Sequence, residues 1–188
     1  MNPALSTGVA GAPPAVPLAL AATTLALLLG LQPVTTDLYL PAFPLLTREL
    51  GAGMAAAQLT MSALILAFGV GQLVWGPLAD RHGRRPVLLA GLSLYAVASL
   101  GCVLATGIEA LVAWRALQGA AMAAAVVCAR AIVRDLYEPV QGAQVMSMAL
   151  TGLGLIALAS PLLGGATAQA IGWRGVLGLC GAVALAAV

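Results

Sequence analysis

The sequence predicts an all-α, polytopic membrane protein. Of its 188 residues, 62% are hydrophobic and only 7% are charged, and the mean hydropathy is +1.04. A water-soluble fold of this length would lack the polar residues needed to cover its surface. The sparse charged and turn-forming clusters divide the chain into apolar runs of about 20 residues, the length that crosses a hydrocarbon core of about 30 Å.

Six transmembrane spans follow from these boundaries. In chain order they are residues 17–43, 55–79, 86–106, 109–134 and 145–171, with a partial sixth span at 175–188. The last run holds about 14 residues and reaches about 21 Å at 1.5 Å per residue, so we expect it to be truncated. Residues 1–16 are rich in Ala, Pro and Gly and carry no charge, and they are predicted to form a disordered cytoplasmic tail.

The distribution of arginines predicts the orientation. The chain has eight Lys and Arg residues in total, all of them Arg, and cytoplasmic loops carry the excess of positive charge. With the N-terminus inside, five arginines fall on the cytoplasmic side, namely Arg81, Arg84, Arg85, Arg130 and Arg134. Only Arg48 and Arg174 fall outside, so the N-terminus is predicted to be cytoplasmic.

Two charged residues lie well inside their spans, away from the ends. Arg115 lies in the fourth span, and Asp37 lies in a polar interruption of the first span that begins at Gln32. Charges at membrane depth are costly and mark functional sites. Each residue sits about six positions from the outer end of its span, roughly 9 Å deep, so we expect Asp37 and Arg115 to pair.

The stretch 76–89, GPLADRHGRRPVLL, concentrates charge between two apolar runs and is predicted to be a water-exposed hairpin. Asp80 and Asp135 are each expected at the C-terminal end of a helix. A carboxylate is unfavourable there, because that end of the helix dipole is negative. Compensation is expected from Arg84, Arg85 or the N-terminus of another helix, giving a charge network at the cytoplasmic ends of spans 2 and 4. The alternative is that the arginines only enforce topology.

Other classes of protein are not favoured. A net charge of +2 is too small a surplus to suggest nucleic-acid binding. The three cysteines lie in apolar runs without CxxC spacing. They are expected to be small buried hydrophobic residues and not reactive thiols. Phosphate-binding loops, dinucleotide fingerprints and metal-spaced Cys/His clusters are missing, so no enzyme activity, cofactor or metal is expected.

The hairpin also resembles a family signature. The pattern Gly-x-Leu-Ala-Asp-Arg-x-Gly-Arg-Arg is similar to the loop between helices 2 and 3 of major facilitator superfamily transporters, with matches at Gly76, Leu78, Ala79, Asp80, Arg81, Gly83, Arg84 and Arg85. Residues 111–121 resemble the helix-4 signature of the same superfamily, in which Arg, Gln and Gly recur at the spacing of Arg115, Gln118 and Gly119.

Further segments resemble one subfamily. Residues 36–42 and 129–137 look like the bicyclomycin- and chloramphenicol-resistance subfamily of drug:proton antiporters. Residues 160–165 resemble the antiporter signature of helix 5 at Pro161, Gly164 and Gly165, although Ser160 stands where many members have Gly. The Gly-Trp-Arg turn at 172–174 also fits.

The resemblance implies the N-terminal six-helix half of a transporter with two such bundles, in which spans 1–3 and 4–6 are inverted repeats. It further implies proton-coupled efflux of small hydrophobic drugs across the bacterial inner membrane, with a second half that is missing here. A transporter of a metabolite or sugar is the alternative within the superfamily. A non-transporting scaffold or inactive fragment is the alternative outside it, against which the two intramembrane charges argue.

The resemblance and the intramembrane charges also assign roles to residues. Proton coupling is expected from Asp37 and Arg115. The gating network would comprise Asp80, Arg81, Arg84, Arg85, Arg134 and Asp135. A substrate cavity would be lined by Tyr39, Phe43 and Met122, whose aromatic and thioether side chains suit adaptable apolar binding.

Overall fold

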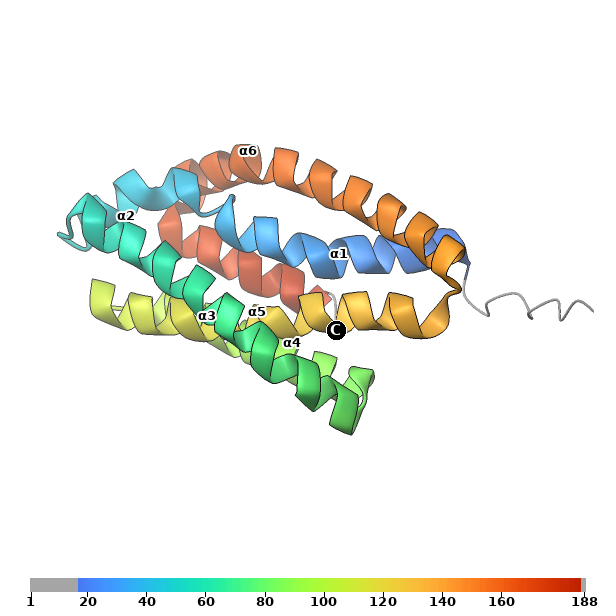
Figure 1. Cartoon of the computed structure of the whole chain (residues 1–188). Coiled ribbons are helices and arrows are strands. Elements are labelled where there is room, and N and C mark those ends of the chain that lie inside the picture. Colours follow the sequence, from blue (N-terminus) through green and yellow to red (C-terminus); the bar gives the residue numbers. More distant parts are fainter. Residues whose placement is uncertain (1–16, 187–188) are drawn as a thin grey trace, which may run out of the picture.

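The computed structural model describes residues 17–186 and is helical, without a strand in that range. The helices, shown in Figure 1, are α1 (Leu18–Thr36), the 3-10 turn η1 (Leu40–Ala42), α2 (Phe43–Glu49), α3 (Met54–His82), α4 (Arg84–Leu104), α5 (Ile108–Leu136) and α6 (Pro139–Ala186). Five helical segments are long and apolar enough to cross a membrane, α1 being counted together with α2. The all-α, polytopic fold is therefore confirmed.

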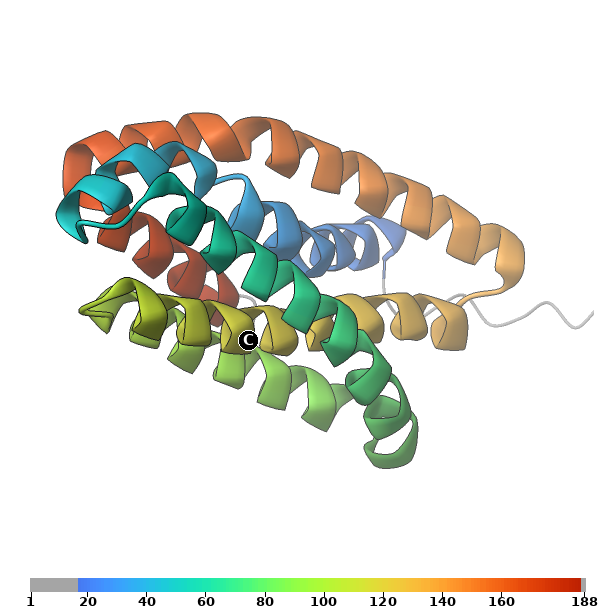
Figure 2. The same cartoon turned by 60° about the vertical axis from the view of Figure 1, so that its left-hand side comes forward.

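The longest helix, α6, folds back on itself. Its backbone turns at Gly172, the one residue of α6 with non-helical angles, where φ is 79°. A side chain at this φ would be strained, and glycine is not. Figures 1 and 2 show the two arms, orange and red, lying against the rest of the bundle. The first arm corresponds to span 5 and the second to span 6. The expected tail at 1–16 and the last residues of span 6 lie outside the described part of the chain.

The helix of the first span is interrupted. Residues 17–43 were predicted as this span, and within it α1 ends at Thr36 and the chain turns before η1, although Leu18–Glu49 together form one segment of membrane length. Pro41 explains the break, because it has no N–H to donate and its ring would collide with the carbonyl group of Asp37 in a continuous helix. The change of direction leaves the last carbonyl groups of α1 free for other partners.

The α3–α4 hairpin turns on one glycine. Gly83 ends α3 and begins α4 with φ of 89°, which a residue with a Cβ adopts only at a cost. The hairpin and the α5–α6 connection lie at the same end of the bundle in both views (Figures 1 and 2). Five arginines therefore gather at one end, as the alternation of spans predicts.

Small residues let the helices approach closely. A Cβ on Gly119 of α5 would overlap the backbone carbonyl of Leu64 in α3, and a Cβ on Gly164 of α6 would overlap that of Leu38. Close packing through small residues is the usual means of helix association in membranes. In the predicted inverted repeat, span 1 (α1) corresponds to span 4 (α5), and span 2 (α3) corresponds to span 5 (the first arm of α6). The contact between α3 and α5 is then equivalent to the contact between α6 and α1.

The helix-5 signature lies within the first arm of α6. The helix continues through Pro161 with helical angles, so no sharp break occurs there. Its two glycines differ in surroundings. Gly164 packs against backbone, whereas a Cβ on Gly165 would meet only the Cβ of Pro41, at 3.9 Å.

Candidate functional site

The most unusual residue of the bundle is Arg115. It lies in the middle of the packed helices with 0% of its surface exposed. Its Nη1 donates to Oε1 of Gln118 at 2.7 Å, and its Nη2 donates to the carbonyl oxygen of Thr35 at 3.1 Å. The guanidinium carbon lies 4.2 Å from the centre of the Tyr39 ring. Arg115 is thus held by an amide, a backbone carbonyl and an aromatic face.

The end of α1 supplies the negative potential that Arg115 needs. Because the helix ends at Thr36, the carbonyl of Thr35 has no partner within the helix and points its lone pairs elsewhere. The C-terminal end of a helix carries a partial negative charge, which attracts a cation. Within residues 17–186, no carboxylate lies within 4.0 Å of the guanidinium of Arg115.

Asp37 lies beside this site without entering it. It caps the C-terminus of α1 and is half-buried, and its Oδ1 accepts a hydrogen bond from the hydroxyl of Thr36 at 2.9 Å. The expected ion pair between Asp37 and Arg115 is therefore not formed in this conformation. On α1, Arg115 donates instead to the carbonyl of Thr35, two residues earlier.

The three residues expected to line a substrate cavity are buried in the core. Tyr39, Phe43 and Met122 are 0%, 8% and 1% exposed. The rings of Tyr39 and Phe43 pack edge to face, with centres 4.9 Å apart, and the Tyr39 hydroxyl lies 3.0 Å from Oγ1 of Thr60. They do not line an open cavity in this conformation, and contact with a substrate stays a prediction.

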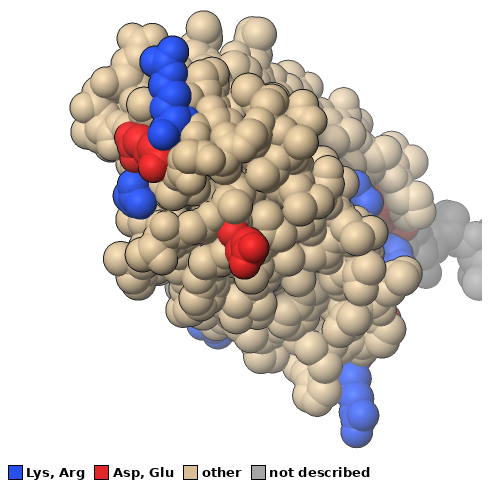
Figure 3. Space-filling view, turned by 90° about the vertical axis from the view of Figure 1, so that its left-hand side faces the viewer, with Lys and Arg blue, Asp and Glu red and all other residues tan. Residues whose placement is uncertain are grey.

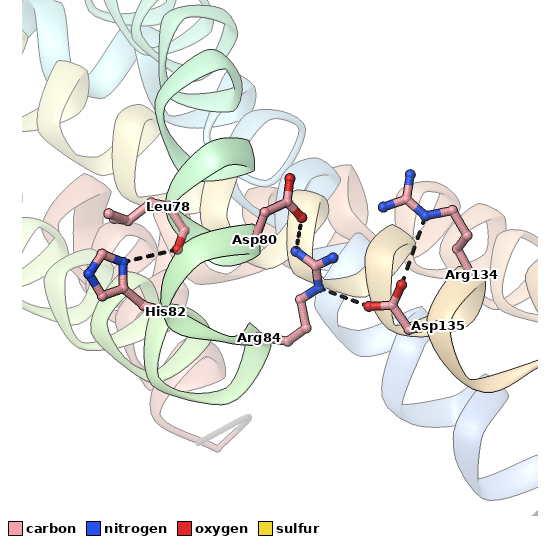
Figure 4. A network of polar contacts seen from close by, with 6 residues as sticks. All are labelled: Leu78, Asp80, His82, Arg84, Arg134 and Asp135. Carbon is pink, nitrogen blue, oxygen red and sulfur yellow. Dashed lines mark hydrogen bonds and ion pairs between the residues drawn. The ribbon is translucent and has the colours of Figure 1, made fainter.

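The charged residues of the hairpin form a network with the end of α5, shown in Figure 4. Arg84 lies between two acids, donating from Nη1 to Asp80 at 2.5 Å and from Nε to Asp135 at 2.9 Å. Arg134 approaches Asp135 at 3.9 Å. Arg84 thereby links the ends of α3 and α5 to the start of α4.

Not every predicted member belongs to this network. In the described part of the chain, Arg81 and Arg85 have no carboxylate within 4.0 Å. Nδ1 of His82 lies 3.2 Å from the carbonyl of Leu78, as Figure 4 shows. Gly76, one turn before Asp80, leaves an open hollow of about 270 Å³ between α3 and α5, which is also lined by Asp80, Arg84, Val127, Arg130, Ala131 and Arg134.

A second polar cluster, which was not predicted from the sequence, lies at the end of the bundle opposite the Arg84 network. Oε2 of Glu49 accepts from the indole of Trp173 at 2.8 Å and pairs with Arg174 at 3.1 Å. Arg174 also donates to the carbonyl of Ala105 at 3.3 Å. Figure 3 faces this end of the bundle and shows few charged groups on a largely uncharged surface, with acidic and basic groups side by side at the upper left. The available signal was the presence of an acid and an arginine on the same predicted outer side of the membrane.

A bundle of membrane-length helices with a buried arginine and a charged hairpin places the chain among the polytopic α-helical membrane proteins. The chain belongs to the Major Facilitator Superfamily, whose family model matches residues 18–188. It is 38% identical over 152 residues to a chloramphenicol resistance protein of Pseudomonas aeruginosa, covering 80% of this chain and 36% of that protein.

Two further relatives come from other bacteria. Multidrug resistance protein D of Escherichia coli is 37% identical over 150 residues, covering 80% of this chain and 38% of that protein. A bicyclomycin resistance protein homolog of Haemophilus influenzae is 33% identical over 168 residues, covering 88% of this chain and 42% of that protein. The resemblance to the bicyclomycin- and chloramphenicol-resistance subfamily is confirmed. The chain spans about two fifths of the length of these relatives.

Proposed function

We propose that the whole protein exports small hydrophobic drugs in exchange for protons. The observation that carries the proposal is Arg115 of α5, which is fully buried and contacts the C-terminal end of α1 near Asp37. No carboxylate within residues 17–186 pairs with it in this conformation. A charge placed inside a membrane bundle is expensive, and a fixed scaffold has no use for it. The relatives named for drug resistance suggest the substrate class.

The coupling step would be a competition for Arg115. In the conformation described here the guanidinium binds the carbonyl of Thr35, and the carboxyl of Asp37 faces the hydroxyl of Thr36. Loss of a proton from Asp37 would create an anion two residues from Thr35, and that anion would compete for Arg115. Protonation would return Arg115 to the carbonyl. The bound proton thus selects between two arrangements of α1 against α5.

Drug binding would use the neighbouring apolar residues. Tyr39 stacks on Arg115, and Phe43 packs against Tyr39, so a movement of α1 would expose both rings together. Met122 lies in the same core cluster and has a flexible side chain that fits ligands of different shape. We propose that these three residues contact the drug in the open conformation.

Orientation follows from the charged ends. The end of the bundle that holds Arg84, Arg130 and Arg134 would face the cytoplasm, and the Glu49–Arg174 end would face outward. We therefore propose that the N-terminus is cytoplasmic. The bacterial origin of the relatives supports the proposal that the protein lies in the inner membrane.

The function is tested by expressing the whole protein in drug-sensitive bacteria. We expect resistance to chloramphenicol or bicyclomycin and lower drug accumulation than in cells with an empty vector, since efflux removes drug against its gradient. Collapsing the proton gradient should restore accumulation. Transport of a sugar or metabolite without resistance would favour the alternative substrate class. Normal membrane levels with no transport of any of these would favour a scaffold.

The Asp80–Arg84–Asp135 network is proposed to stabilise one closed state at the cytoplasmic side. Asp80→Asn should slow efflux several-fold with little change in drug affinity, because the pair is solvent-exposed and holds a conformation and not the ligand. The measurement is the drug concentration dependence of efflux. Glu138→Gln, an exposed acid outside the network, is the matched control. Equal losses of affinity and rate would place Asp80 in the binding site instead.

A further inference from the structure

Two residues of α4 lie directly behind the groups that hold Arg115. Nε2 of Gln118 donates to Oγ of Ser99 at 2.7 Å, and the hydroxyl of Tyr95 lies 2.5 Å from Oγ1 of Thr35. Ser99 in turn donates to the carbonyl of Tyr95 at 2.9 Å. Each of the two residues whose oxygen atoms accept from Arg115 is therefore connected to α4 by one further hydrogen bond. The contacts close into a ring through α5, α4 and α1.

The direction of each hydrogen bond is fixed by the number of protons. Oγ1 of Thr35 donates its only proton to the carbonyl of Leu31 at 2.6 Å, so it must accept from the Tyr95 hydroxyl. The hydroxyl of Ser99 donates its only proton to the Tyr95 carbonyl, so its oxygen must accept from the amide nitrogen of Gln118. The amide oxygen of Gln118 is thereby forced to face Arg115.

Loss of either α4 contact would disturb a different acceptor of Arg115. Without the Ser99 hydroxyl, the Gln118 amide is free to turn and present its NH₂ group to a cation. Without the Tyr95 hydroxyl, the last turn of α1 loses the contact that aims the Thr35 carbonyl at Arg115. Within residues 17–186, Nε of Arg115 is buried without a partner, and Nη2 has a further contact only with the sulfur of Met61, at 3.9 Å. The guanidinium therefore has no third hydrogen bond to oxygen to replace the one that is lost.

We propose that Tyr95 and Ser99 are positioning residues for Arg115. Tyr95 and Ser99 would hold the two oxygen atoms that accept from Arg115 in place while Asp37 is turned away. They would thereby determine how readily Arg115 leaves the Thr35 carbonyl for the Asp37 carboxylate. The proposal rests on the proposed proton-coupled function and extends it to α4, a helix to which neither the sequence motifs nor the intramembrane charges gave a role in coupling.

The test compares Tyr95→Phe and Ser99→Ala with matched controls in the whole protein. Tyr137→Phe is the control for the first, since Tyr137 is also largely buried but makes no side-chain hydrogen bond within residues 17–186. Ser93→Ala is the control for the second, since Ser93 is exposed on the same helix. We expect each α4 variant to lower the maximal efflux rate about tenfold, the effect of about one hydrogen bond in a charged network, with KM changed less than about twofold. Ser99→Thr, which keeps the hydroxyl, should restore the rate.

A second measurement does not depend on transport. In protein labelled with ¹⁵N-arginine, the guanidinium protons of Arg115, assigned through Arg115→Lys, should exchange slowly with water because the group is fully buried. Tyr95→Phe and Ser99→Ala should accelerate this exchange at least about tenfold, and the controls should not. If the wild type transports no drug, the proposed function fails, and this exchange still decides whether α4 holds Arg115.

The positioning role is overturned if both α4 variants match their controls in exchange, or if exchange changes while the efflux rate does not. A rate loss that Ser99→Thr does not restore would also contradict it for Ser99. Tyr95→Phe removes a single oxygen atom and keeps the ring in the core, so it decides the question if Ser99→Ala fails to insert into the membrane.

Discussion

Asp37→Asn is expected to reduce proton-driven efflux to the level of cells that lack the protein. Asparagine keeps the size of the side chain and accepts a hydrogen bond from Thr36 as the carboxylate does, but it neither binds nor releases a proton. Arg115 would then stay on the Thr35 carbonyl, because no anion competes for it. The measurement is drug efflux in membrane vesicles under an imposed proton gradient.

Two comparisons separate this loss from misfolding. Membrane levels and the unfolding temperature of Asp37→Asn should match the wild type, since the residue is half-buried and carries no ion pair within residues 17–186. Glu109→Gln, which removes an exposed acid at the start of α5, should leave efflux unchanged. If Asp37→Asn still pumps against a gradient and releases protons when drug is added, Asp37 is not the proton carrier.

Much of the fold could be predicted because hydropathy and charge alternate along the chain on the scale of a membrane. The helix ends near Asp80, Arg84 and Arg134 follow from the cost of charge in hydrocarbon, and the return of α6 at Gly172 follows from the turn between spans 5 and 6. The first span was predicted at 17–43, but the break of its helix after Thr36 was not located. Pro41 carried the missing signal, because a proline disrupts the turn that precedes it.

The site was predicted less completely because depth alone does not fix a contact. Asp37 and Arg115 were placed at the same depth, but equal depth does not decide which way a side chain points, and the carboxyl of Asp37 faces the hydroxyl of Thr36. On α1, Arg115 donates to a backbone carbonyl. Every residue has this group, so residue identity does not indicate which carbonyl accepts. The same limit hid Tyr95 and Ser99, whose role depends on the packing of α4 against α1 and α5.

The Arg84 network was easier to foresee. Asp80 and Arg84 are four residues apart across the hairpin, so their proximity is nearly set by the chain itself. Only the contact between Arg84 and Asp135 required knowledge of how α5 packs beside the hairpin. The outer cluster of Glu49 and Arg174 joins residues far apart in the sequence, and nothing local indicates their pairing.

Gly164→Ala is expected to destabilise the bundle, whereas Gly165→Ala is not. At Gly164 a Cβ would overlap the carbonyl group of Leu38, so α1 and α6 would have to separate. Overpacking of this kind costs about 1 to 3 kcal/mol. The displaced segment leads directly to Tyr39, which stacks on Arg115, so efflux should fall together with stability. The measurement is thermal unfolding in detergent alongside efflux at matched membrane levels.

Gly165→Ala is the matched control, because it adds the same methyl group to the next residue of the same helix. A Cβ there meets only Pro41, at an ordinary contact distance of 3.9 Å. The change should be neutral or raise stability by up to about 1 kcal/mol, since alanine favours a helix more than glycine does. Gly119→Ala should behave like Gly164→Ala, because its Cβ would overlap the Leu64 carbonyl. Equal effects of the two neighbouring substitutions would show that the signature glycines act by bending the helix and not by letting α1 and α6 touch.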